Sequence, residues 1–513
     1  MPRPVFACCL SVPKVAALAG PAQNGADGRR SVVAALALLA LSPGLSGCIL
    51  GSERPELNLE VPARYQNAPK GSADAALPVL DWWRGFHSGE LTTLMEAAQV
   101  SNLDIAAAIA QVVQADAQVG VAGAALLPNV TGTGTAEREH FGSEASSSGS
   151  SNSSIGGGIG GRGSTFSFFS AGLTASYIVD FWGKNRALLA ASEESASVSR
   201  YNREVVTLTT IVTVANTYFQ ILAAQDQIRV TRRNIAAAER ILALIKDQFA
   251  GGTASQLDVS QQEALVATQR AAIPPLEVTL GQNIAAMALL VGRAAPNFKL
   301  RGGSTTQIAV PRVTPGLPSE LLYQRPDVRQ AEAQLADSNF SVEAARAAFF
   351  PQIQLTGTTG FQSAALASLF TPGAWFYTLA AGLTQPIFDG FLLESQLKLA
   401  KGVQLQNLQA YRKSVLSAFA DVEKALIALQ KFTLQERLQT DAVTSSRKAF
   451  EVAETQLRGG TVNLVTVLQA EQTLFTAENT LVQVRLSKLL AASSLFQALG
   501  GGWTSAGTLV ALQ

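Results

Sequence analysis

The chain has 513 residues, of which 47% are hydrophobic and only 7% aromatic, and its formal net charge is +1. Lys and Arg form no basic cluster, so the charge pattern argues against nucleic acid as a partner. The length allows several domains or one large architecture, and the abundance of Ala, Leu and Val favours long helices over an aromatic-rich core.

The chain begins with a predicted export signal over residues 1–47. Two arginines precede an apolar run at 32–41, which is too short to cross a membrane. The run is followed by the letters LSGC, which resemble a bacterial lipobox. That resemblance implies cleavage before Cys48 and acylation of this cysteine. Ile49 stands where an Asp would mark retention in the inner membrane, which favours the outer membrane, and the long prefix before Arg29 suggests a later start codon.

Cysteine usage and motifs bound the possible chemistry. The chain has 3 cysteines, and two of them fall within the leader. The mature chain would keep only Cys48, which excludes disulfides and cysteine-ligated metals. No HExxH, GxSxG or paired CxxC motif occurs, and the glycine-rich run at 156–165 lacks the Gly-Lys-Ser/Thr of a phosphate loop. We expect no enzymatic activity, no metal, and no cofactor apart from the covalent lipid on Cys48.

The two ends of the mature chain are expected to lie outside the repeated part of the sequence. Residues 48–90 form a lipidated N-terminal segment in this interpretation, and residues 500–513 form a C-terminal tail. The N-terminal segment contains the letters DWWRGF at Asp81–Phe86. We expect these aromatic side chains to pack the segment along the periplasmic helices rather than to contact a substrate.

A first repeat is predicted for residues 91–294. It opens with a helix and continues with a strand pair at about 127–141 and 164–182, where residues alternate with a period of two. A helix hairpin with its tip at 250–255 follows. Apolar residues recur every seven positions before this tip, which predicts supercoiled helices. The members of this series are Val214, Ile221, Ile228, Ile235, Leu242 and Phe249.

A linker at 295–318 leads to a second repeat at 319–499. This repeat has a helix, a strand pair at about 350–363 and 374–389, and a hairpin whose tip lies at 458–463. No proline interrupts the helix before either tip, so each is predicted to be about 100 Å long. The heptads fit a closed ring of helices and an ordinary bundle equally well. The second series consists of Val422, Leu429, Val443, Phe450 and Leu457.

The two tips share a sequence. A turn between antiparallel helices needs at least one residue with positive φ, which glycine adopts without steric cost. Either Thr253 or Ser255 is the candidate N-cap after the first tip, and Asn463 is the candidate after the second. AGGTASQLDVSQQEALV at Ala250–Val266 and RGGTVNLVTVLQAEQTL at Arg458–Leu474 match at Gly251/Gly459, Gly252/Gly460, Thr253/Thr461, Val259/Val467, Gln261/Gln469 and Glu263/Glu471.

The strand count has a consequence for assembly. Four strands per chain cannot close a transmembrane β-barrel, because the smallest known barrels have about eight strands. An open sheet edge cannot face lipid, so strands that cross the outer membrane must share one barrel among several chains. Without the predicted export signal and lipobox, a soluble β-hairpin would explain the same alternation of residues. The predicted fold class is a mixed α and β membrane protein that requires an oligomer.

These features together resemble the TolC-like outer membrane factor family, in its lipoprotein branch that serves tripartite efflux pumps. The resemblance covers essentially the whole mature chain. It implies a homotrimer in which twelve strands close a β-barrel in the outer membrane and twelve helices continue it as a periplasmic α-barrel. It also implies a periplasmic adaptor (membrane fusion) protein and an inner-membrane proton-driven RND pump as partners. The resemblance is carried by Cys48, Asp81–Phe86, LLYQRPDVRQAEAQL at Leu321–Leu335, the paired tips, and the PNV and PQI strand starts.

The resemblance also implies roles for the tips. Six similar tips per trimer would approximate sixfold symmetry, and the docking residues for the adaptor would be Gly251, Gly252, Thr253, Gly459, Gly460 and Thr461. The periplasmic gate would fall on Val465 and Gln469, where relatives often carry an acidic residue in place of Gln469. Asp258 and Arg458 are further gate candidates. Asp258 could hydrogen-bond, pair with Arg458 of a neighbouring hairpin, or remain a solvated charge.

The most specific motif, Arg325-Pro326-Asp327, predicts a helix start in which Pro326 sets the first turn and Asp327 satisfies free N–H groups. No nucleotide-binding motif occurs, so we expect a passive channel that carries small molecules delivered by an inner-membrane pump. Two alternatives stay open from the sequence. One is the outer-membrane channel of a type I protein secretion system, and the other is a non-conducting lipoprotein scaffold that tethers envelope layers.

Overall fold

The chain divides into two units, residues 1–53 and 54–513. The computed structural model describes residues 56, 62, 64–67, 79–141, 164–311 and 318–503, all in the second unit. The predicted lipidation site Cys48, the leader before it and residues 504–513 of the tail lie outside the described residues.

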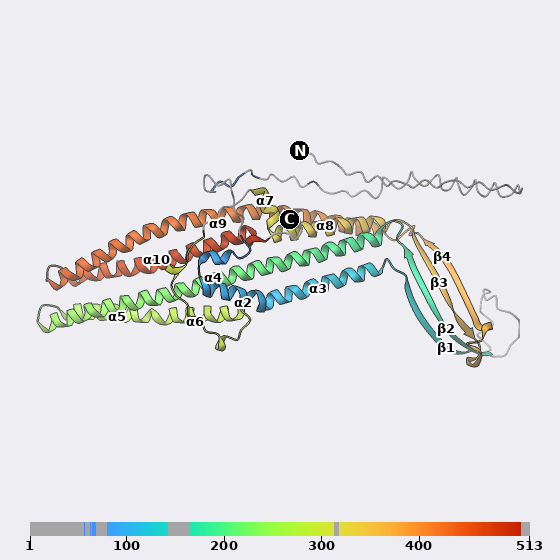
Figure 1. Ribbon diagram of the computed structural model, residues 1–513, viewed down its shortest axis with the longest axis horizontal. Coiled ribbons are helices and arrows are strands. Elements are labelled where there is room, and N and C mark those ends of the chain that lie inside the picture. The colour runs from blue at the N-terminus through green and yellow to red at the C-terminus, as the bar shows by residue number, and fades with distance from the viewer. Residues whose placement is uncertain are drawn as a thin grey trace. The chain divides into compact units, whose positions relative to one another are not determined.

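The described part is mostly helical (Figure 1). The two longest helices, α4 and α9, have 67 residues each, which corresponds to about 100 Å as predicted. Short 3₁₀ helices include η1 (Trp82–Phe86) and η4 (Thr305–Gln307). The α-helices are α2 (Gly89–Ser101), α3 (Leu103–Ala124), α4 (Lys184–Ala250), α5 (Gln256–Ala271), α6 (Ile273–Leu290), α7 (Pro318–Gln324), α8 (Pro326–Ala347), α9 (Leu392–Arg458) and α10 (Leu464–Ala498).

Four strands form one antiparallel sheet in the order β1-β2-β3-β4. The pairing of β2 with β3 joins the two halves of the chain, and Gly172 lies opposite Gly360 there. A Cβ atom on Gly360 would lie 2.4 Å from the carbonyl oxygen of Ala171, so only glycine fits this approach. β1 and β4 are the two edges of the described sheet. The strands are β1 (Asn129–Phe141), β2 (Ser164–Val179), β3 (Gln352–Ser363) and β4 (Trp375–Thr384).

The sheet continues from the ends of α3, α4, α8 and α9 (Figure 1). Many of its apolar side chains stay exposed in the single chain, including Leu355, Trp375, Tyr377, Leu379 and Leu383. Contiguous exposed apolar surface marks contact with lipid or with another protein. Its presence on an alternating strand set favours a membrane location over a soluble hairpin.

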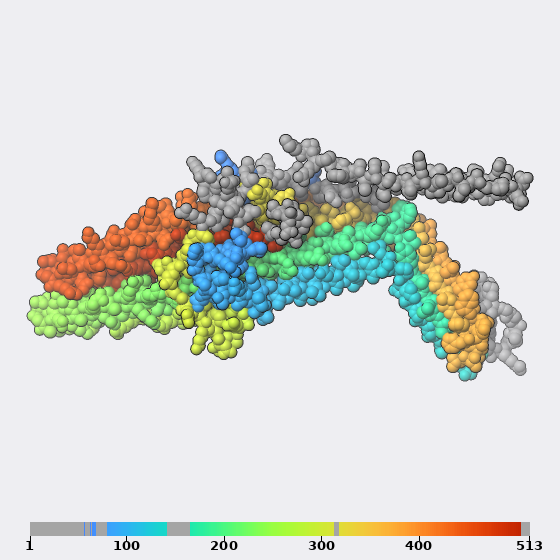
Figure 2. All heavy atoms as spheres, in the orientation of Figure 1, coloured from blue at the N-terminus to red at the C-terminus, as the bar shows by residue number. Residues whose placement is uncertain are grey.

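Each half of the chain contains a helix hairpin. In the first half α4 packs against α5 and α6, and in the second half α9 packs against α10. The two hairpins also lie against each other, with α10 beside α4 (Figure 2). One apolar cluster near the tips joins all four of α4, α5, α9 and α10, and it includes Ile241, Ile245, Val259, Phe450, Leu457, Val467, Leu474 and Phe475.

The two seven-residue series pack differently. In α9 the series stays buried as far as Leu457, except that Leu429 is half-buried. In α4 it is buried from Val214 to Ile235, but Phe249 is 44% exposed, and Ile241 and Ile245 are buried instead. An α-helix has 3.6 residues per turn, so a strict seven-residue series drifts by about 20° per heptad across the contact face. The predicted stripe was therefore wrong for the last part of α4.

The return arms of the two hairpins also differ. α5 ends at Ala271, and α6 begins at Ile273 with prolines in its first turn. A proline lacks the N–H that would continue the hydrogen-bond ladder, so Pro274 and Pro275 break this arm into two helices. α10 is a single helix of 35 residues.

The largest described apolar cluster lies where the N-terminal segment meets both hairpins. Trp82 stacks on Phe496 of α10 with ring centroids 4.6 Å apart. Phe86 contacts Phe219 of α4 at 5.1 Å, and all four rings are buried. This packing confirms the prediction that Asp81–Phe86 fixes the N-terminal segment to the helices.

Polar contacts tie the linker between the halves to α4 and α2. The buried Asp226 carboxylate of α4 accepts hydrogen bonds from the Thr305 N–H at 2.8 Å and the Ser304 hydroxyl at 3.1 Å. Glu90 of α2 accepts hydrogen bonds from the N–H groups of Arg301 at 2.9 Å and Gly302 at 3.1 Å. The linker is thus anchored to the middle of the first hairpin.

Candidate functional site

The first hairpin tip is closed by one left-handed glycine and one threonine. Gly251 keeps a helical φ of −82°, whereas Gly252 has φ 77°. The Thr253 N–H and hydroxyl donate to the Gln248 carbonyl oxygen at 2.9 and 3.0 Å. The hydroxyl of Thr253 therefore closes the preceding helix and is not the N-cap of the next one.

The second tip has the same geometry. Gly459 has φ −80° and Gly460 has φ 72°. The Thr461 N–H and hydroxyl donate to the Gln456 carbonyl oxygen at 2.9 and 3.1 Å. The prediction that each turn needs a glycine with positive φ is confirmed, but only one glycine of each pair has that conformation.

The helices that leave the tips start with different caps. Ser255 caps α5 in a capping box, in which its N–H donates to Asp258 Oδ2 at 2.8 Å and its hydroxyl accepts from the Asp258 N–H at 3.2 Å. Hydrogen bonds from the Ser255 hydroxyl and N–H lower the pKa of Asp258. Asn463 caps α10 as predicted, accepting from the Thr466 N–H at 3.1 Å.

The two charged gate candidates do not meet in this chain. Asp258 is engaged by Ser255, so of its three predicted roles it has the local hydrogen bond. Arg458 pairs instead with Glu454, one turn earlier on α9, at 2.6 Å. Among the described residues, therefore, both groups act within their own hairpin ends.

The two neutral gate candidates share one surface of the second hairpin. Val465 is 54% exposed and Gln469 is also exposed, and both line a groove of about 510 Å³ between α9 and α10. The remaining described lining is small or polar and consists of Ser445, Ser446, Ala449, Asn463, Thr466, Ala470 and Thr473. The face that holds both candidates is accessible and uncharged.

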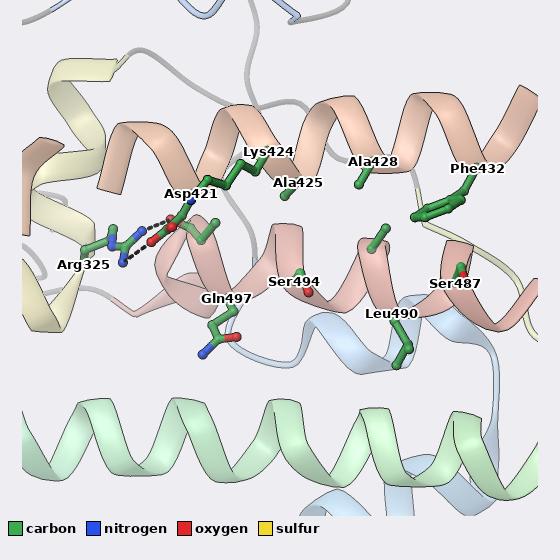
Figure 3. Close-up of a pocket in the computed structure, with 12 residues that line it drawn as sticks. Arg325, Asp421, Lys424, Ala425, Ala428, Phe432, Ser487, Leu490, Ser494 and Gln497 are labelled. Atoms are coloured by element: carbon green, nitrogen blue, oxygen red, sulfur yellow. Dashed lines mark hydrogen bonds and ion pairs between the residues drawn. The ribbon is translucent and has the colours of Figure 1, made fainter. Parts of the chain in front are cut away.

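Arg325 of the motif Arg325-Pro326-Asp327 lies at one end of a second cavity, of about 590 Å³, between α9 and α10 (Figure 3). The buried Arg325 guanidinium donates to Asp327 at 2.6 and 2.9 Å, to Asp421 of α9 at 3.3 Å and to the Ala498 carbonyl oxygen at 3.3 Å. Pro326 starts α8 as predicted. The predicted role of Asp327 was wrong, because its carboxylate accepts from Arg325 rather than from free N–H groups.

Sequence reasoning missed two buried polar contacts. One is the bridge from Arg325 to Asp421, which joins residues 96 positions apart. The other is the contact of Gln262 with Glu471, between the two hairpins. A usable signal was present for the second, since Glu471, Glu478 and Arg485 recur every seven residues beside the apolar registers of α10.

Long paired hairpins joined to an exposed apolar strand set define the subunit of a membrane-embedded channel. Two stretches, Gly89–Ala124 and Lys184–Ala250, are also long and apolar enough to cross a membrane by length and composition. Length and composition alone do not make either a membrane span. In the second stretch 56% of the most apolar window is buried by packing, and helix core positions pass the same test.

Comparison with known proteins gives the same class. The profile of the family described as outer membrane efflux protein matches residues 94–293 and 317–501. The pyoverdine export outer membrane protein OpmQ of Pseudomonas putida is 38% identical over 472 residues, which are 91% of this chain and 97% of that protein. The probable outer membrane lipoprotein SilC of Salmonella typhimurium is 30% identical over 465 residues, 90% of this chain and 96% of that protein. The crystal structure of the Campylobacter jejuni CmeC outer membrane channel superimposes with a TM-score of 0.80 at 24% identity, covering 90% of this chain and 98% of that one.

The chain belongs to the outer membrane efflux protein family. It is an outer-membrane channel component of a tripartite efflux pump and has the TolC-like fold, mostly helical with a small sheet. Pump and adaptor proteins are the partners that such a component requires, and its relatives are channels rather than enzymes.

Proposed function

We propose that three copies of the chain form one passive exit duct, with twelve strands closing a β-barrel in the outer membrane. The observation that carries this proposal is the four-stranded sheet, whose edges β1 and β4 lack a second partner among the described strands. Pairing each edge with the opposite edge of a neighbouring copy would remove every open edge from the lipid. The family resemblance favours three copies over two.

The helices would extend the duct through the periplasm as a ring of twelve, four from each copy. Exposed apolar side chains on two helices support this part of the proposal, because another copy would cover them. They include Leu103 at the start of α3, Val113 and Val121 further along it, and Leu405, Leu416 and Leu438 on α9. The repeated hairpins would then present six similar tips at the inner end.

The tips would dock a periplasmic adaptor, which links the duct to a proton-driven RND pump in the inner membrane. Support comes from the matched geometry of the two tips, since Gly252 and Gly460 give both hairpins the same turn. Val465 and Gln469 would face the lumen as the closed gate. Their uncharged groove weakens any expectation that this ring binds cations.

The cargo would be small organic molecules, and pyoverdine is the first to test. Two similar relatives, at 38% and 36% identity, are named for pyoverdine export. A lipid on Cys48 would anchor each copy, and the segment 48–90 would then run along α9. Support for that path comes from Tyr65, buried against Val415 and Val422, and from Asn67, which donates to Glu423. Lipid labelling that persists in Cys48→Ser would refute the anchor.

Planar bilayer recordings of the purified protein test the duct. We expect discrete conductance steps, with a higher open probability in a Val465→Ser, Gln469→Ser variant than in the unmodified protein. A matched change at an exposed α9 position that is not part of the groove lining, Val452→Ser, should leave the open probability unchanged. An absence of conductance in all three proteins would refute a conducting function and favour a tethering scaffold.

A further inference from the structure

Two polar side chains are sealed inside the apolar contact between the hairpins. Glu471 of α10 and Gln262 of α5 are both 0% exposed. The Gln262 amide nitrogen donates to the Ala238 carbonyl oxygen of α4 at 3.0 Å and lies 3.5 Å from Glu471 Oε2. The pair therefore connects three helices and both hairpins. Their surroundings are the apolar tip cluster of Ile241, Ile245, Val259, Val467, Leu474 and Phe475.

The hydrogen bonding of this pair is incomplete in one specific way. Gln262 Oε1 and Glu471 Oε1 are both buried and have no donor among the described residues. An ionised carboxylate has no hydrogen to offer, so it would leave both oxygens unpaired at a large cost. A protonated carboxyl supplies the one O–H donor that the pair lacks. The packed interface thus favours the neutral acid.

Charged neighbours do not replace that proton. Two charged side chains face Glu471 from neighbouring helices, Arg240 of α4 and Glu454 of α9. Glu454 already pairs with Arg458 at 2.6 Å. On α5 the charged residue beside Gln262 is Glu263, which pairs with Lys246 of α4 at 2.7 Å. The pKa of Glu471 is raised to about 7, mainly by burial and further by the nearby charge of Glu454. The Gln262 hydrogen bond and the charge of Arg240 lower this pKa in part.

The position of Glu471 links this proton to the gate. Val465 and Gln469 precede Glu471 on α10 and lie on the accessible side of the same helix. We propose that Glu471 and Gln262 form a proton-controlled latch, which holds the second hairpin against the first when Glu471 is neutral and releases it when Glu471 ionises. The inference rests on the proposed duct, since release would move the gate-bearing face of α10.

The direction of the pH effect follows from proton linkage. A released Glu471 would titrate near its ordinary pKa of 4.5, whereas the packed one titrates near 7. Between these values the packed state binds a proton that the released state does not. The latch should therefore weaken as pH rises through this window and change little above it.

Distances between spin labels on the two hairpins test the latch. Labels at Leu257→Cys on α5 and Val452→Cys on α9 occupy exposed positions. In the assembled protein we expect a narrow distance distribution at about pH 5 and a longer, broader one at about pH 8. Glu471→Gln should keep the narrow distribution at both pH values, because an amide supplies the missing donor without a charge.

Glu263→Gln is the matched control, since Glu263 occupies the aligned position in the first hairpin but is exposed. It should respond to pH like the unmodified protein. If Glu471→Gln does not assemble, the double variant Glu471→Leu, Gln262→Leu should show the same locked distribution. A pH response that survives in these variants, or none in the unmodified protein, would overturn the latch. An unmodified protein that forms no trimer, or that shows no conductance, would instead refute the proposed duct.

Discussion

The two halves of the chain close their hairpins with the same type of turn, but they fix the start of the helix before each strand pair with different side chains. At the tips, the left-handed glycine and the threonine bond to the preceding helix agree to within a few degrees and about 0.1 Å. At the helix that leads to each strand pair, the first half uses Asn102 and the second uses Arg325. Backbone conformation restricts the tip to few residues, whereas a helix start can be tethered in several ways.

Identical letters can also have different environments. Glu263 and Glu471 are aligned, yet Glu263 is exposed and paired with Lys246 while Glu471 is fully buried. The reason is the contact between hairpins, because α10 packs on α4 and turns its Glu471 face inward. The comparison shows that sequence similarity between the halves predicts the geometry of the turn but not which of two aligned residues is buried.

Substitutions at the starts of α3 and α8 should give the largest difference in stability between the two halves. Arg325→Ala removes the buried guanidinium and leaves Asp327 and Asp421 without their partner. We expect the free energy of unfolding to fall by about 3 kcal/mol. This value is at the low end for breaking a buried ion pair, because both carboxylates are partly exposed. Thermal unfolding of the purified protein measures it.

Asn102→Ala is the matched change in the first half. Asn102 caps α3 through the N–H groups of Asp104 and Ile105 at 2.9 and 3.0 Å and donates to the Leu290 carbonyl oxygen at 2.8 Å. Loss of a cap of this kind costs about 1 kcal/mol. Equal losses in the two variants would mean that the buried charge adds nothing to the second half.

The tips should respond alike to substitution. Gly460→Val and Gly252→Val each place a β-branched residue at positive φ, which costs about 1–3 kcal/mol. The strain is local, so we expect trimers in the membrane but a loss of export. Export assays beside outer-membrane trimer yield measure both effects.

Gly459→Ala is the control for the second tip. Its φ of −80° suits alanine, and a Cβ there would meet the Gln456 carbonyl oxygen at an ordinary 3.6 Å. Export should remain near that of the unmodified protein. A loss of trimer in Gly460→Val would mean that the turn serves assembly and not docking.

The corners between strand and helix offer a smaller contrast. Gly183 before α4 and Phe391 before α9 are both left-handed, with φ 78° and 66°. A left-handed L-residue costs about 1–2 kcal/mol, and glycine loses about half of that in chain entropy. Phe391→Gly should therefore raise the unfolding free energy by about 1 kcal/mol or less. A destabilised variant would show that the exposed Phe391 ring makes contacts in the assembly.

The smallest effect is expected at the helix starts beside the tips. Asp258 aligns with Thr466, so only the first tip has a carboxylate at this position. Ser255 lowers the pKa of Asp258 below its ordinary 3.8, so its capping contribution is present above that value and declines as pH falls through the lowered pKa. Amide exchange at the start of α5 should increase at low pH, whereas α10 should not change. Asp258→Asn should remove this difference.

Local chemistry was predictable from the sequence, and long-range pairing was not. The positive-φ turn, the Pro326 helix start and the Asn463 cap depend on residues a few positions apart. The partner of Arg325 lies on another helix, and the burial of Glu471 depends on which face of α10 meets α4. The heptads predicted that the helices pack against one another. They did not predict which residues are buried at the end of α4, because a straight helix drifts relative to a seven-residue period.

Disulfide cross-linking between the two sheet edges tests the central claim most directly. Cysteine pairs, one on β1 and one on β4, are oxidised in the outer membrane, and the products are separated by mass. Three copies that share one barrel predict covalent dimers and trimers with nothing larger. An internal pair at Thr174 and Thr358, which face each other on β2 and β3, should give only links within one chain. Monomers alone across the whole β1–β4 panel, or products beyond the trimer, would contradict a closed three-chain barrel.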